Sequence, residues 1–473
     1  MPIETQVLII GAGPGGYVAG IKLGQLGKKA LLVDRDALGG ECLNYGCIPS
    51  KAMISAAGIV HKARKAREIG VEAPELRVDM AKVQAWRANV IRGLNRGIGA
   101  LSKANGVEVR MGEARLTGQG SAEVKGADGA VETIRFEHAI LAAGSRAVEV
   151  PGLPFDGRNV LSNKEALELP EVPQRLLVVG GGVIGLEIGT YLAKLGTKVT
   201  VAEMLPQLLT GVDPELAQPV ARSLTKLGVE VLLDSKAASF EEMLDGLEVV
   251  LATPQGERRI VVDKILVSVG RKPNSRDLGL EAAGVKADAR GFVAVDPRYR
   301  TSVPRIHAVG DLIGPPFLAH KASREGVLAA LAIAGEEPAP IGHVPSAIFT
   351  DPEIAFVGLT EAQAREQGLE PVVGRFPFAA SGRAQTTREG EGFVKVVADK
   401  KTGRLLGAAI VGPSASDLIA EACLALRLEA NLEDVASTIH PHPTLPEAFQ
   451  EACEAALGTP IHLAPASKSV SSY

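Results

Sequence analysis

A glycine-rich turn between an apolar run and a helical pattern occurs twice in this chain, and this repeat constrains the fold most. The first copy runs from Gly11 to Gly16 after the apolar run 6–10, and a second apolar run then ends in Asp34. A dinucleotide-binding fold typically has this order of parts: strand, turn, helix, strand and acid. The pattern predicts that Gly11 forms a tight turn, Gly13 admits a pyrophosphate, and Gly16 allows close packing of helix and strand. Asp34 is expected to accept hydrogen bonds from ribose hydroxyls.

The second copy has the same parts in the same order. The apolar run 175–179 leads to Gly180, Gly182 and Gly185, and the acid that ends the next run is Glu203. One such glycine motif is weak support for a nucleotide site, whereas two copies with matched flanking runs are strong support. The chain is therefore predicted to be an α/β protein with two doubly wound, Rossmann-like dinucleotide-binding domains.

The acid of the second copy also predicts which nicotinamide coenzyme binds there. Glu203 would repel the 2′-phosphate of NADP, and the six residues after it contain no arginine that could neutralise that phosphate. The second site is therefore expected to prefer NAD.

The pattern changes after about residue 345. Apolar runs typical of strands occupy 347–357, 393–397 and 405–411, and two helical stretches follow near 416–428 and 445–457. This section contains no nucleotide motif and is predicted to be a separate α+β domain.

Composition excludes several classes of function. Among 473 residues the net charge is −4, which gives no sign of nucleic-acid binding. No stretch approaches the roughly 18 apolar residues of a membrane span, and the short run Val7–Ile10 does not predict a signal peptide. Four cysteines are too few for a secreted disulfide scaffold, so a reducing, cytoplasmic location is expected.

Two of the four cysteines, Cys42 and Cys47, follow the first nucleotide motif closely. In a regular helix, Cα atoms five residues apart are separated by about 8–9 Å, whereas a disulfide requires about 4.4–6.8 Å. The pair can bridge only if a helix is distorted or begins here, which Gly46 and Pro49 favour. A strained and accessible disulfide is of the labile, catalytic kind. The other two cysteines, Cys423 and Cys453, fall in apolar helical patterns and are expected to be inert core residues.

Two histidines near the C-terminus are candidates for proton transfer. His440 and His442 precede a probable helix, and Glu447 could hold one ring nitrogen of His442. The alternatives are loop histidines held by prolines, or half of a metal site. No group of Cys and His has zinc spacing, so no metal is expected. At the end of another apolar run, Asp311 is either a ligand contact or a helix cap.

Three groups of residues together resemble a known family. They are the run from Cys42 to Lys51, the pair Gly310-Asp311, and His442-Pro443-Thr444 with Glu447. On these motifs the chain resembles the pyridine nucleotide–disulfide oxidoreductases, and among them the dihydrolipoamide dehydrogenases, over nearly its whole length.

The resemblance implies an organisation and a set of partners. FAD would bind to the first fold and NAD to the second, and the implied domains are FAD-binding over 1–148, NAD-binding over 149–274, FAD-binding again over 275–345, and a dimerisation interface over 346–473. A homodimer would combine both chains in each active site. The implied partners are the lipoyl domain and subunit-binding domain of an acyltransferase, or a lipoylated glycine-cleavage carrier, with no nucleic acid and no membrane.

The resemblance also implies a role for individual residues. Cys47 would lie against the flavin and Cys42 would exchange with substrate. Lys51 would sit near the flavin and pair with Glu187, while His442 would act as the base and Glu447 would orient it. The residues implied to contact FAD are Gly11, Gly13, Gly16, Asp34, Lys51, Ala114, Gly144, Ser145, Asp311, Leu318 and Ala319. Those implied to contact NAD are Gly180, Gly182, Gly185, Glu203 and Gly270.

The chain departs from the family pattern at Glu41, Tyr45 and Pro441. A carboxylate at Glu41 is expected to raise the pKa of the Cys42 thiol if it lies close to it. The absence of cysteine from the tail 464–473 argues against large thioredoxin reductases and mercuric reductases. The expected activity is the reoxidation of dihydrolipoyl groups by NAD⁺. The alternatives are another NAD(P)H-dependent disulfide reductase, or an inactive assembly subunit that would not need the intact cysteines.

Overall fold

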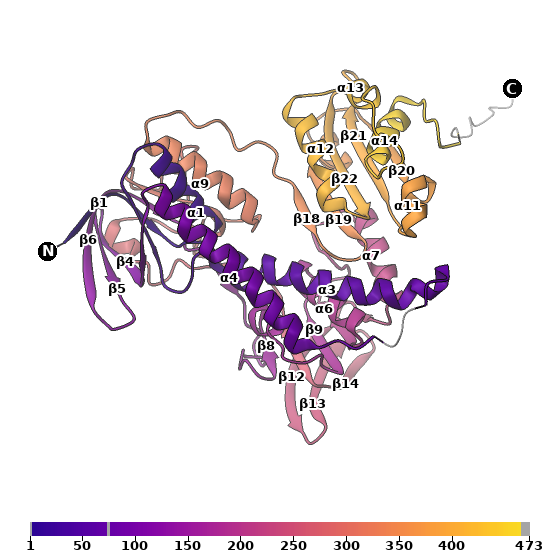
Figure 1. The fold of residues 1–473 in the computed structure, drawn as a ribbon, viewed down its shortest axis with the longest axis horizontal. Coiled ribbons are helices and arrows are strands. Elements are labelled where there is room, and N and C mark those ends of the chain that lie inside the picture. The colour runs from indigo at the N-terminus through magenta and orange to yellow at the C-terminus, as the bar shows by residue number, and fades with distance from the viewer. Residues whose placement is uncertain (1, 73–75, 465–473) are drawn as a thin grey trace.

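The computed structural model describes residues 2–72 and 76–464, so nearly all of the tail 464–473 lies outside the described residues. Figure 1 shows three lobes, and the long helices α3 (Cys47–Lys65) and α4 (Met80–Ala104) cross between two of them. Within the described ranges, no helix is both long enough and apolar enough to span a membrane.

The first unit is built on a sheet with the strand order β3-β2-β1-β6-β5-β4, and β17 also pairs with β6. The core strands β1, β2, β3, β6 and β17 are parallel, whereas β4, β5 and β6 form an antiparallel meander. The remaining elements of its first part are β1 (Ile3–Ile10), α1 (Pro14–Gln25), β2 (Ala30–Asp34), α2 (Gly40–Tyr45), η1 (Ala66–Ile69), β3 (Glu108–Met111), β4 (Glu113–Gly118), β5 (Ser121–Lys125), β6 (Val131–Leu141) and β7 (Ser145–Ala147).

The second unit repeats this plan. Its parallel sheet has the order β11-β10-β9-β15-β8, and an antiparallel meander β12-β13-β14 accompanies it. Its elements are β8 (Val160–Leu161), α5 (Asn163–Leu167), β9 (Arg175–Val179), α6 (Val183–Leu195), β10 (Lys198–Ala202), α7 (Pro214–Lys226), β11 (Glu230–Leu232), β12 (Lys236–Met243), β13 (Gly246–Thr253), β14 (Gly256–Val262), β15 (Lys264–Val267) and β16 (Arg271–Pro273).

The chain then returns to the first unit, where β17 joins the first sheet. The returning elements are α8 (Leu280–Ala283), β17 (Ile306–Ala308), η2 (Gly310–Ile313) and α9 (Ala319–Ile333). In Figure 1, α9 lies beside α1, and a long connection leads from α9 to the third lobe.

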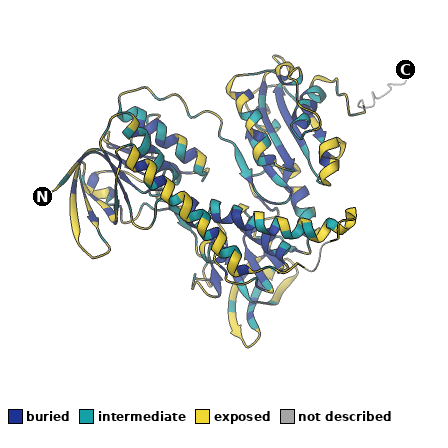
Figure 2. Cartoon of the chain, viewed as in Figure 1, coloured by how far each residue is buried: buried dark blue, intermediate teal, exposed yellow. Residues whose placement is uncertain are grey.

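The third unit is an antiparallel sheet in the order β18-β19-β22-β21-β20. Helices α12 and α14 pack on this sheet, and buried residues line its strands in Figure 2. Its elements are β18 (Ser346–Ile348), β19 (Glu353–Gly358), α10 (Glu361–Glu366), β20 (Pro371–Pro377), η3 (Phe378–Ala380), α11 (Gly382–Thr387), β21 (Phe393–Asp399), β22 (Leu405–Gly412), α12 (Ala415–Arg427), α13 (Leu432–Ala436) and α14 (Glu447–Leu457).

These elements follow from the sequence pattern, with one exception. The predicted α/β class with two Rossmann-like units and a C-terminal α+β unit is confirmed. Strands β1 and β9 are apolar along most of their length and become buried, because helices cover both faces of a parallel sheet. The apolar run 347–357, however, forms two antiparallel strands, β18 and β19, and Pro352 lies in the turn between them.

The glycines of the two nucleotide motifs meet different steric demands. Gly11 has φ +102°, and a Cβ there would overlap the carbonyl oxygen of Ala142. A Cβ at Gly16 would overlap the carbonyl oxygen of Gly11, so the helix can approach the strand only without a side chain. Gly180, with φ +104°, and Gly185 repeat this pattern in the second unit.

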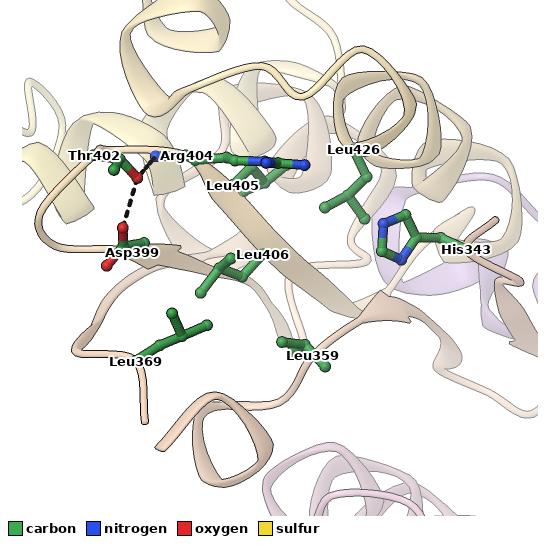
Figure 3. A pocket seen from close by; sticks show the side chains of 9 residues that line it. All are labelled: His343, Leu359, Leu369, Asp399, Thr402, Arg404, Leu405, Leu406 and Leu426. Carbon is green, nitrogen blue, oxygen red and sulfur yellow. Dashed lines mark hydrogen bonds between the residues drawn. The ribbon is translucent and has the colours of Figure 1, made fainter. Parts of the chain in front are cut away.

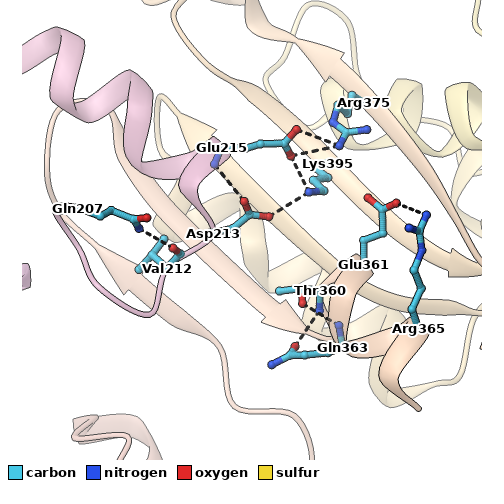
Figure 4. Close-up of polar contacts among 10 residues, drawn as sticks. All are labelled: Gln207, Val212, Asp213, Glu215, Thr360, Glu361, Gln363, Arg365, Arg375 and Lys395. Atoms are coloured by element: carbon cyan, nitrogen blue, oxygen red, sulfur yellow. Dashed lines mark hydrogen bonds and ion pairs between the residues drawn. The ribbon is translucent and has the colours of Figure 1, made fainter. Parts of the chain in front are cut away.

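An ionic network attaches the third unit to the second. Figure 4 shows Lys395 of β21 between Asp213 and Glu215, which lie at the N-terminus of α7. The Lys395 Nζ is 3.0 Å from Asp213 Oδ2 and 2.6 Å from Glu215 Oε2, and Arg375 of β20 also contacts Glu215 at 3.1 Å. Because the Lys395 side chain is only 6% exposed, its ammonium group has lost most of its contact with water, and these carboxylates offset the cost of burying the charge.

Replacing Lys395 with Met should therefore lower the free energy of unfolding at pH 7 by about 1–3 kcal/mol. Burial raises the pKa of Asp213, but its hydrogen bonds with the Glu215 amide and Lys395 outweigh burial and leave the pKa below its usual value. A lowered folded-state pKa stabilises the fold above the unfolded-state pKa, and this contribution is lost as the pH falls through the folded-state pKa. The difference between wild type and variant should thus shrink below about pH 4.

Urea unfolding at pH 7 and at low pH would measure this difference. The control is Arg365→Met, which breaks the exposed pair Arg365–Glu361 in the same region (Figure 4) and should change stability by less than about 0.5 kcal/mol. An equal loss of stability in both variants would contradict a special role for the buried Lys395.

Candidate active site

The helix break predicted between the two cysteines is present. Helix α2 ends at Tyr45, Gly46 leaves helical geometry with φ −130° and ψ −106°, and α3 begins at Cys47. Cys42 thus lies on one short helix and Cys47 is the first residue of the next. Both cysteines are free thiols, and they lie close enough for each to shift the pKa of the other. The change of direction at Gly46 brings together two sulfurs that a continuous helix would separate.

The two thiols have unequal acidity. The hydrogen bond from the Cys42 thiol lowers the pKa of Cys47 to about 7, and the positive charge of Lys51 acts in the same direction against burial. The same hydrogen bond, together with burial, raises the pKa of Cys42. Cys47 also stands at the N-terminus of α3, where the helix dipole favours an anion. When one proton is lost from the pair, the thiolate therefore forms at Cys47.

Lys51 and Glu187 lie together, as the resemblance implied. The Lys51 Nζ is 2.8 Å from Glu187 Oε2, and Ser50 Oγ donates to the same oxygen at 3.1 Å. Glu187 lies on α6 and is only 4% exposed, and its other oxygen accepts the Phe349 amide at 3.0 Å. One buried carboxylate therefore connects the redox helix α3 with both the second and third units.

The two acids of the nucleotide motifs occupy equivalent places: Asp34 ends β2, and Glu203 directly follows β10. Asp34 Oδ2 accepts the amide of Ala12 at 2.6 Å, and Glu203 Oε2 accepts the amide of Gly181 at 2.6 Å. Each acid thus holds its glycine turn directly. A carboxylate oxygen has further lone pairs, so this contact leaves room for the predicted ribose hydroxyls.

The space before α1 and α6 fits a pyrophosphate. Gly13 and Gly182 are the N-cap residues of these helices, and both have negative φ. A Cβ added at Gly13 would find its nearest protein atom, the Cα of Gly40, at 4.0 Å, and one added at Gly182 would find Ser268 O at 3.9 Å. No protein group requires glycine at these two positions. Open space at a helix N-terminus is what an anionic group needs.

Asp311 lies in η2 within a chain of polar contacts. Ser145 Oγ donates to Asp311 Oδ2 at 2.5 Å and accepts from Arg271 Nε at 2.7 Å. Burial raises the pKa of Asp311, although the hydrogen bond from Ser145 and the charges of Arg271 and Lys321 oppose this. Asp311 is thus a partly buried acid with a partner, and it is not the N-cap of η2, which is Val309.

The other residues implied to contact cofactors are spread over both units. Gly144 lies between β6 and β7 with φ +69°, and Gly270 lies between β15 and β16 with φ +132°. Leu318 and Ala319 form the N-terminus of α9. The Ala114 side chain of β4 is packed in the core of the first unit, so only its backbone is available to a ligand.

The structure gives the Glu41 carboxylate partners that the sequence did not reveal. Its carboxylate pairs with Arg271 at 2.5 Å, and Asn163 donates to its other oxygen at 3.3 Å. Glu41 is not among the five largest causes of the shifted pKa of Cys42. The sequence showed only that the two residues are adjacent, and the partner that takes up the charge comes from a distant strand. Arg271 follows β15 in the chain, and no motif of the sequence marks it as the partner of Glu41.

The two histidines have different surroundings. His442 Nδ1 is 2.8 Å from Glu447 Oε1, and its side chain is 78% exposed. His440 is nearly buried, and its nitrogens contact Glu421 Oε1 at 2.9 Å and the Thr438 carbonyl at 2.8 Å. Only His442 keeps a ring nitrogen available for a substrate. Among the described residues, no hydrogen bond or ion pair joins this loop to Cys42 or Cys47 of the same chain.

The remaining cysteines and the pocket of the third unit lie outside this site. Cys453 is fully buried in the third core, and burial raises its pKa and that of the half-buried Cys423. Figure 3 shows a pocket of ≈ 320 Å³ that is lined mainly by leucines, with His343 and Arg404 at its sides. None of its lining residues is a cysteine, so this pocket does not contribute to thiol chemistry.

Comparisons with known proteins agree with this geometry. Residues 5–326 match a family described as pyridine nucleotide-disulphide oxidoreductase, and residues 344–453 match its dimerisation domain. The chain is 50% identical over 463 residues to a dihydrolipoyl dehydrogenase of Haloferax volcanii, covering 97% of each chain. It is 47% identical over 463 residues to that of Geobacillus stearothermophilus, covering 98% of each.

Two solved structures have the same fold at lower sequence identity. One is LpdA from Mycobacterium tuberculosis, with a TM-score of 0.89, 27% identity, and coverage of 95% of this chain and 99% of that chain. The other is the HOCl-induced flavoprotein disulfide reductase RclA of Escherichia coli, with a TM-score of 0.84, 26% identity and the same coverage.

Replacing Lys51 with Met should raise the pKa of Cys47 above its value of about 7, because Lys51 supplies a positive charge that favours the thiolate. The ultraviolet absorbance of the thiolate, followed against pH in the reduced protein, would measure the change. Lys164→Met is a matched control, since Lys164 contacts Tyr45 and is not among the groups that shift the pKa of Cys47. Equal titration of wild type and Lys51→Met would contradict this electrostatic role.

Proposed function

Because the chain belongs to the pyridine nucleotide-disulphide oxidoreductase family, we propose that it reoxidises protein-bound dihydrolipoyl groups and passes their electrons to NAD⁺. It is a flavoprotein disulfide oxidoreductase whose cofactors are FAD and NAD(H). The observation that carries the proposal is the Cys42–Cys47 pair, which flanks the helix break at Gly46 and in which each thiol shifts the pKa of the other in the opposite direction.

The residues that would hold the cofactors follow from the geometry. FAD would lie on the first glycine turn with Asp311 and Lys51 beside it, and NAD would lie on the second turn with Glu203 at its ribose. When bound, FAD accepts the electron pair of a dithiol and delivers hydride to NAD⁺. The protein supplies alignment, because α3 carries both Cys47 and Lys51 between the two nucleotide units.

The thiol chemistry is assigned to the cysteines and the exposed histidine. His442, held by Glu447, removes a proton from one thiol of the substrate. The free thiols of this structure correspond to the reduced pair, and the reaction begins from the oxidised pair, in which the two sulfurs are joined by a disulfide. The substrate thiolate attacks Cys42 Sγ, the Cys42–Cys47 bond breaks, and Cys47 leaves as the thiolate that its surroundings favour. The second substrate thiol then displaces Cys42. The products are the cyclic lipoyl disulfide and a reduced enzyme pair.

The histidine and the cysteines are proposed to come from different subunits. The dimerisation domain supports a homodimer, and within one chain the His442 loop has no bond to either thiol among the described residues. We assign the lipoyl domain and the subunit-binding domain of an acyltransferase, or a lipoylated glycine-cleavage carrier, as partners. We also propose a cytoplasmic location, because four cysteines among 473 residues are too few for a secreted disulfide scaffold.

The direct test of this function is reduction of NAD⁺ by dihydrolipoamide with the purified holoenzyme. Turnover is expected from wild type and not from Cys42→Ser, which lacks the exchanging thiol. An enzyme that consumes NADH with another disulfide, and does not use dihydrolipoamide, would instead be a different disulfide reductase. If the protein still contains bound FAD but shows neither NAD⁺ reduction by dihydrolipoamide nor NADH consumption with another disulfide, the result would favour an inactive assembly subunit.

The role of His442 leads to a prediction for the reductive half-reaction. His442→Gln should slow reduction of the enzyme by dihydrolipoamide about 10²–10⁴-fold, the usual contribution of a general base. Reduction of the flavin by NADH should change far less, because hydride transfer does not need this base. Glu447→Gln should give a milder defect of the same kind, since Glu447 orients the ring.

His440→Gln is the matched control for this experiment. Its ring is bonded on both nitrogens, so its loss should leave both half-reactions nearly unchanged. Stopped-flow kinetics of the three variants would compare them. A large defect in His440→Gln with a small one in His442→Gln would show that the wrong histidine carries the proton.

Glu203 leads to a prediction for coenzyme choice. The wild type should prefer NAD⁺ to NADP⁺ in kcat/KM by at least roughly tenfold, about 1.4 kcal/mol, because the carboxylate repels a 2′-phosphate. Glu203→Gln should narrow this preference while keeping an oxygen for the Gly181 amide. Steady-state kinetics with both coenzymes would measure the ratio. Equal kcat/KM values in the wild type would contradict the assignment.

A further inference from the structure

The short helix α2, which carries Cys42, is attached to other elements at both of its ends. Near its N-terminus, Arg271 of β16 donates to Glu41 Oε2 at 2.5 Å. At its C-terminus, Asn163 of α5 donates to the Tyr45 carbonyl at 2.7 Å and to Glu41 Oε1 at 3.3 Å. These contacts come from elements distant in sequence and converge on one helix of six residues.

A contact of the Tyr45 ring adds to this attachment. The Nζ of Lys164, the neighbour of Asn163, lies 4.2 Å from the centroid of the Tyr45 ring. Glu41 and Tyr45 are also two of the positions at which this chain departs from the pattern it resembles. The proposed thiol chemistry assigns no role to either residue, and both make their contacts with elements outside the redox motif.

Arg271 is held rigidly enough to act as an anchor. Its Nε donates to Ser145 Oγ at 2.7 Å, one terminal nitrogen donates to the Ser145 carbonyl at 2.9 Å, and its side chain is 15% exposed. Ser145 is fixed in turn by its bond to Asp311. A planar guanidinium bonded on several sides loses little further freedom when it binds a carboxylate.

Helix α2 needs such an anchor because of its length. A helix of six residues contains few internal hydrogen bonds and does not hold its position by itself. Cys42 lies next to Glu41 and within one turn of Tyr45. A small shift of α2 would move the Cys42 sulfur away from the Cys47 sulfur. The interaction between the two thiols would then weaken, because it depends steeply on their separation.

We propose that Arg271 and Asn163 are positioning residues for the redox pair: they hold α2, through Glu41 and the Tyr45 carbonyl, in the place where the Cys42 thiol reaches Cys47. Residues of two other elements thus determine the position of the Cys42 thiol relative to Cys47 and the rate at which Cys42 reacts with unrelated reagents. The proposal deepens the proposed disulfide chemistry and rests on it for its kinetic importance, but the placement of Cys42 can be tested without turnover.

The test measures the reactivity of each cysteine in the holoenzyme reduced with dithiothreitol. Iodoacetamide alkylates a thiolate with loss of iodide, and mass spectrometry of peptides gives separate rates for Cys42, Cys47 and Cys423. Arg271→Met should raise the rate at Cys42 about three- to tenfold, the equivalent of one lost hydrogen bond. The rate at Cys423, which is half-buried in the third unit, should stay the same.

A double-mutant cycle shows whether Arg271 acts through Glu41. Glu41→Gln should also raise the rate at Cys42, and the double variant Glu41→Gln/Arg271→Met should match Arg271→Met alone, because both changes remove one interaction. Arg271→Lys, which keeps the charge, should restore part of the protection. Arg298→Met is the matched control, since it breaks an arginine–glutamate pair with Glu337 on the surface.

Three results would overturn the proposal. The first is an unchanged alkylation rate at Cys42 in Arg271→Met. The second is a double variant in which the effects of Glu41→Gln and Arg271→Met on that rate are independent. The third is an equal rise of the alkylation rate at Cys423, which would indicate that the whole protein has loosened. If Arg271→Met does not fold, Asn163→Ala takes its place and must raise the rate at Cys42 alone. Absence of dihydrolipoamide turnover in the wild type would instead contradict the proposed function and leave these alkylation rates to decide the role of Arg271.

Discussion

The interruption of the helix at Gly46 is the constraint on which the rest of the site depends. It ends α2 and makes Cys47 the first residue of the 19-residue helix α3, so that the Cys47 sulfur receives both a helix N-terminus and the Cys42 thiol as partners. Lys51 then follows one turn later on α3 and faces Glu187. Without the interruption, the two sulfurs would point away from each other, and Cys47 would have neither the Cys42 thiol nor a helix N-terminus as a partner.

The two nucleotide units place this helix between equivalent sites. Each unit presents a glycine turn at the carboxyl end of its central strand, and each acid, Asp34 or Glu203, bonds an amide of its own turn. Because α3 packs against α6 of the second unit while it begins beside the first, one helix connects both sites to the thiols. This placement supports the order of disulfide, flavin and nicotinamide that we propose.

The third unit carries the histidine that we propose as the base, and it matches the dimerisation domain of the family. Its exposed His442 is oriented by Glu447, whereas His440 is bound on both ring nitrogens. The ionic contacts of Lys395 with the N-terminus of α7 fix this unit on the second one. A rigid attachment matters for the proposed function, because a base presented to a partner subunit is useful only if its own domain does not rotate.

The sequence by itself determined the features that depend on neighbouring residues. The two glycine motifs, their terminal acids, the spacing of Cys42 and Cys47 and the break at Gly46 are local, because turns, helices and strands obey short-range steric rules. The roles of the site residues and the limits of the domains stay predictions drawn from a resemblance. The tertiary structure alone decided that Arg271 pairs with Glu41, and that His442 rather than His440 keeps a ring nitrogen available. These outcomes involve partners far apart in the chain, and a charge or a ring nitrogen pairs with whatever the fold brings within about 3 Å.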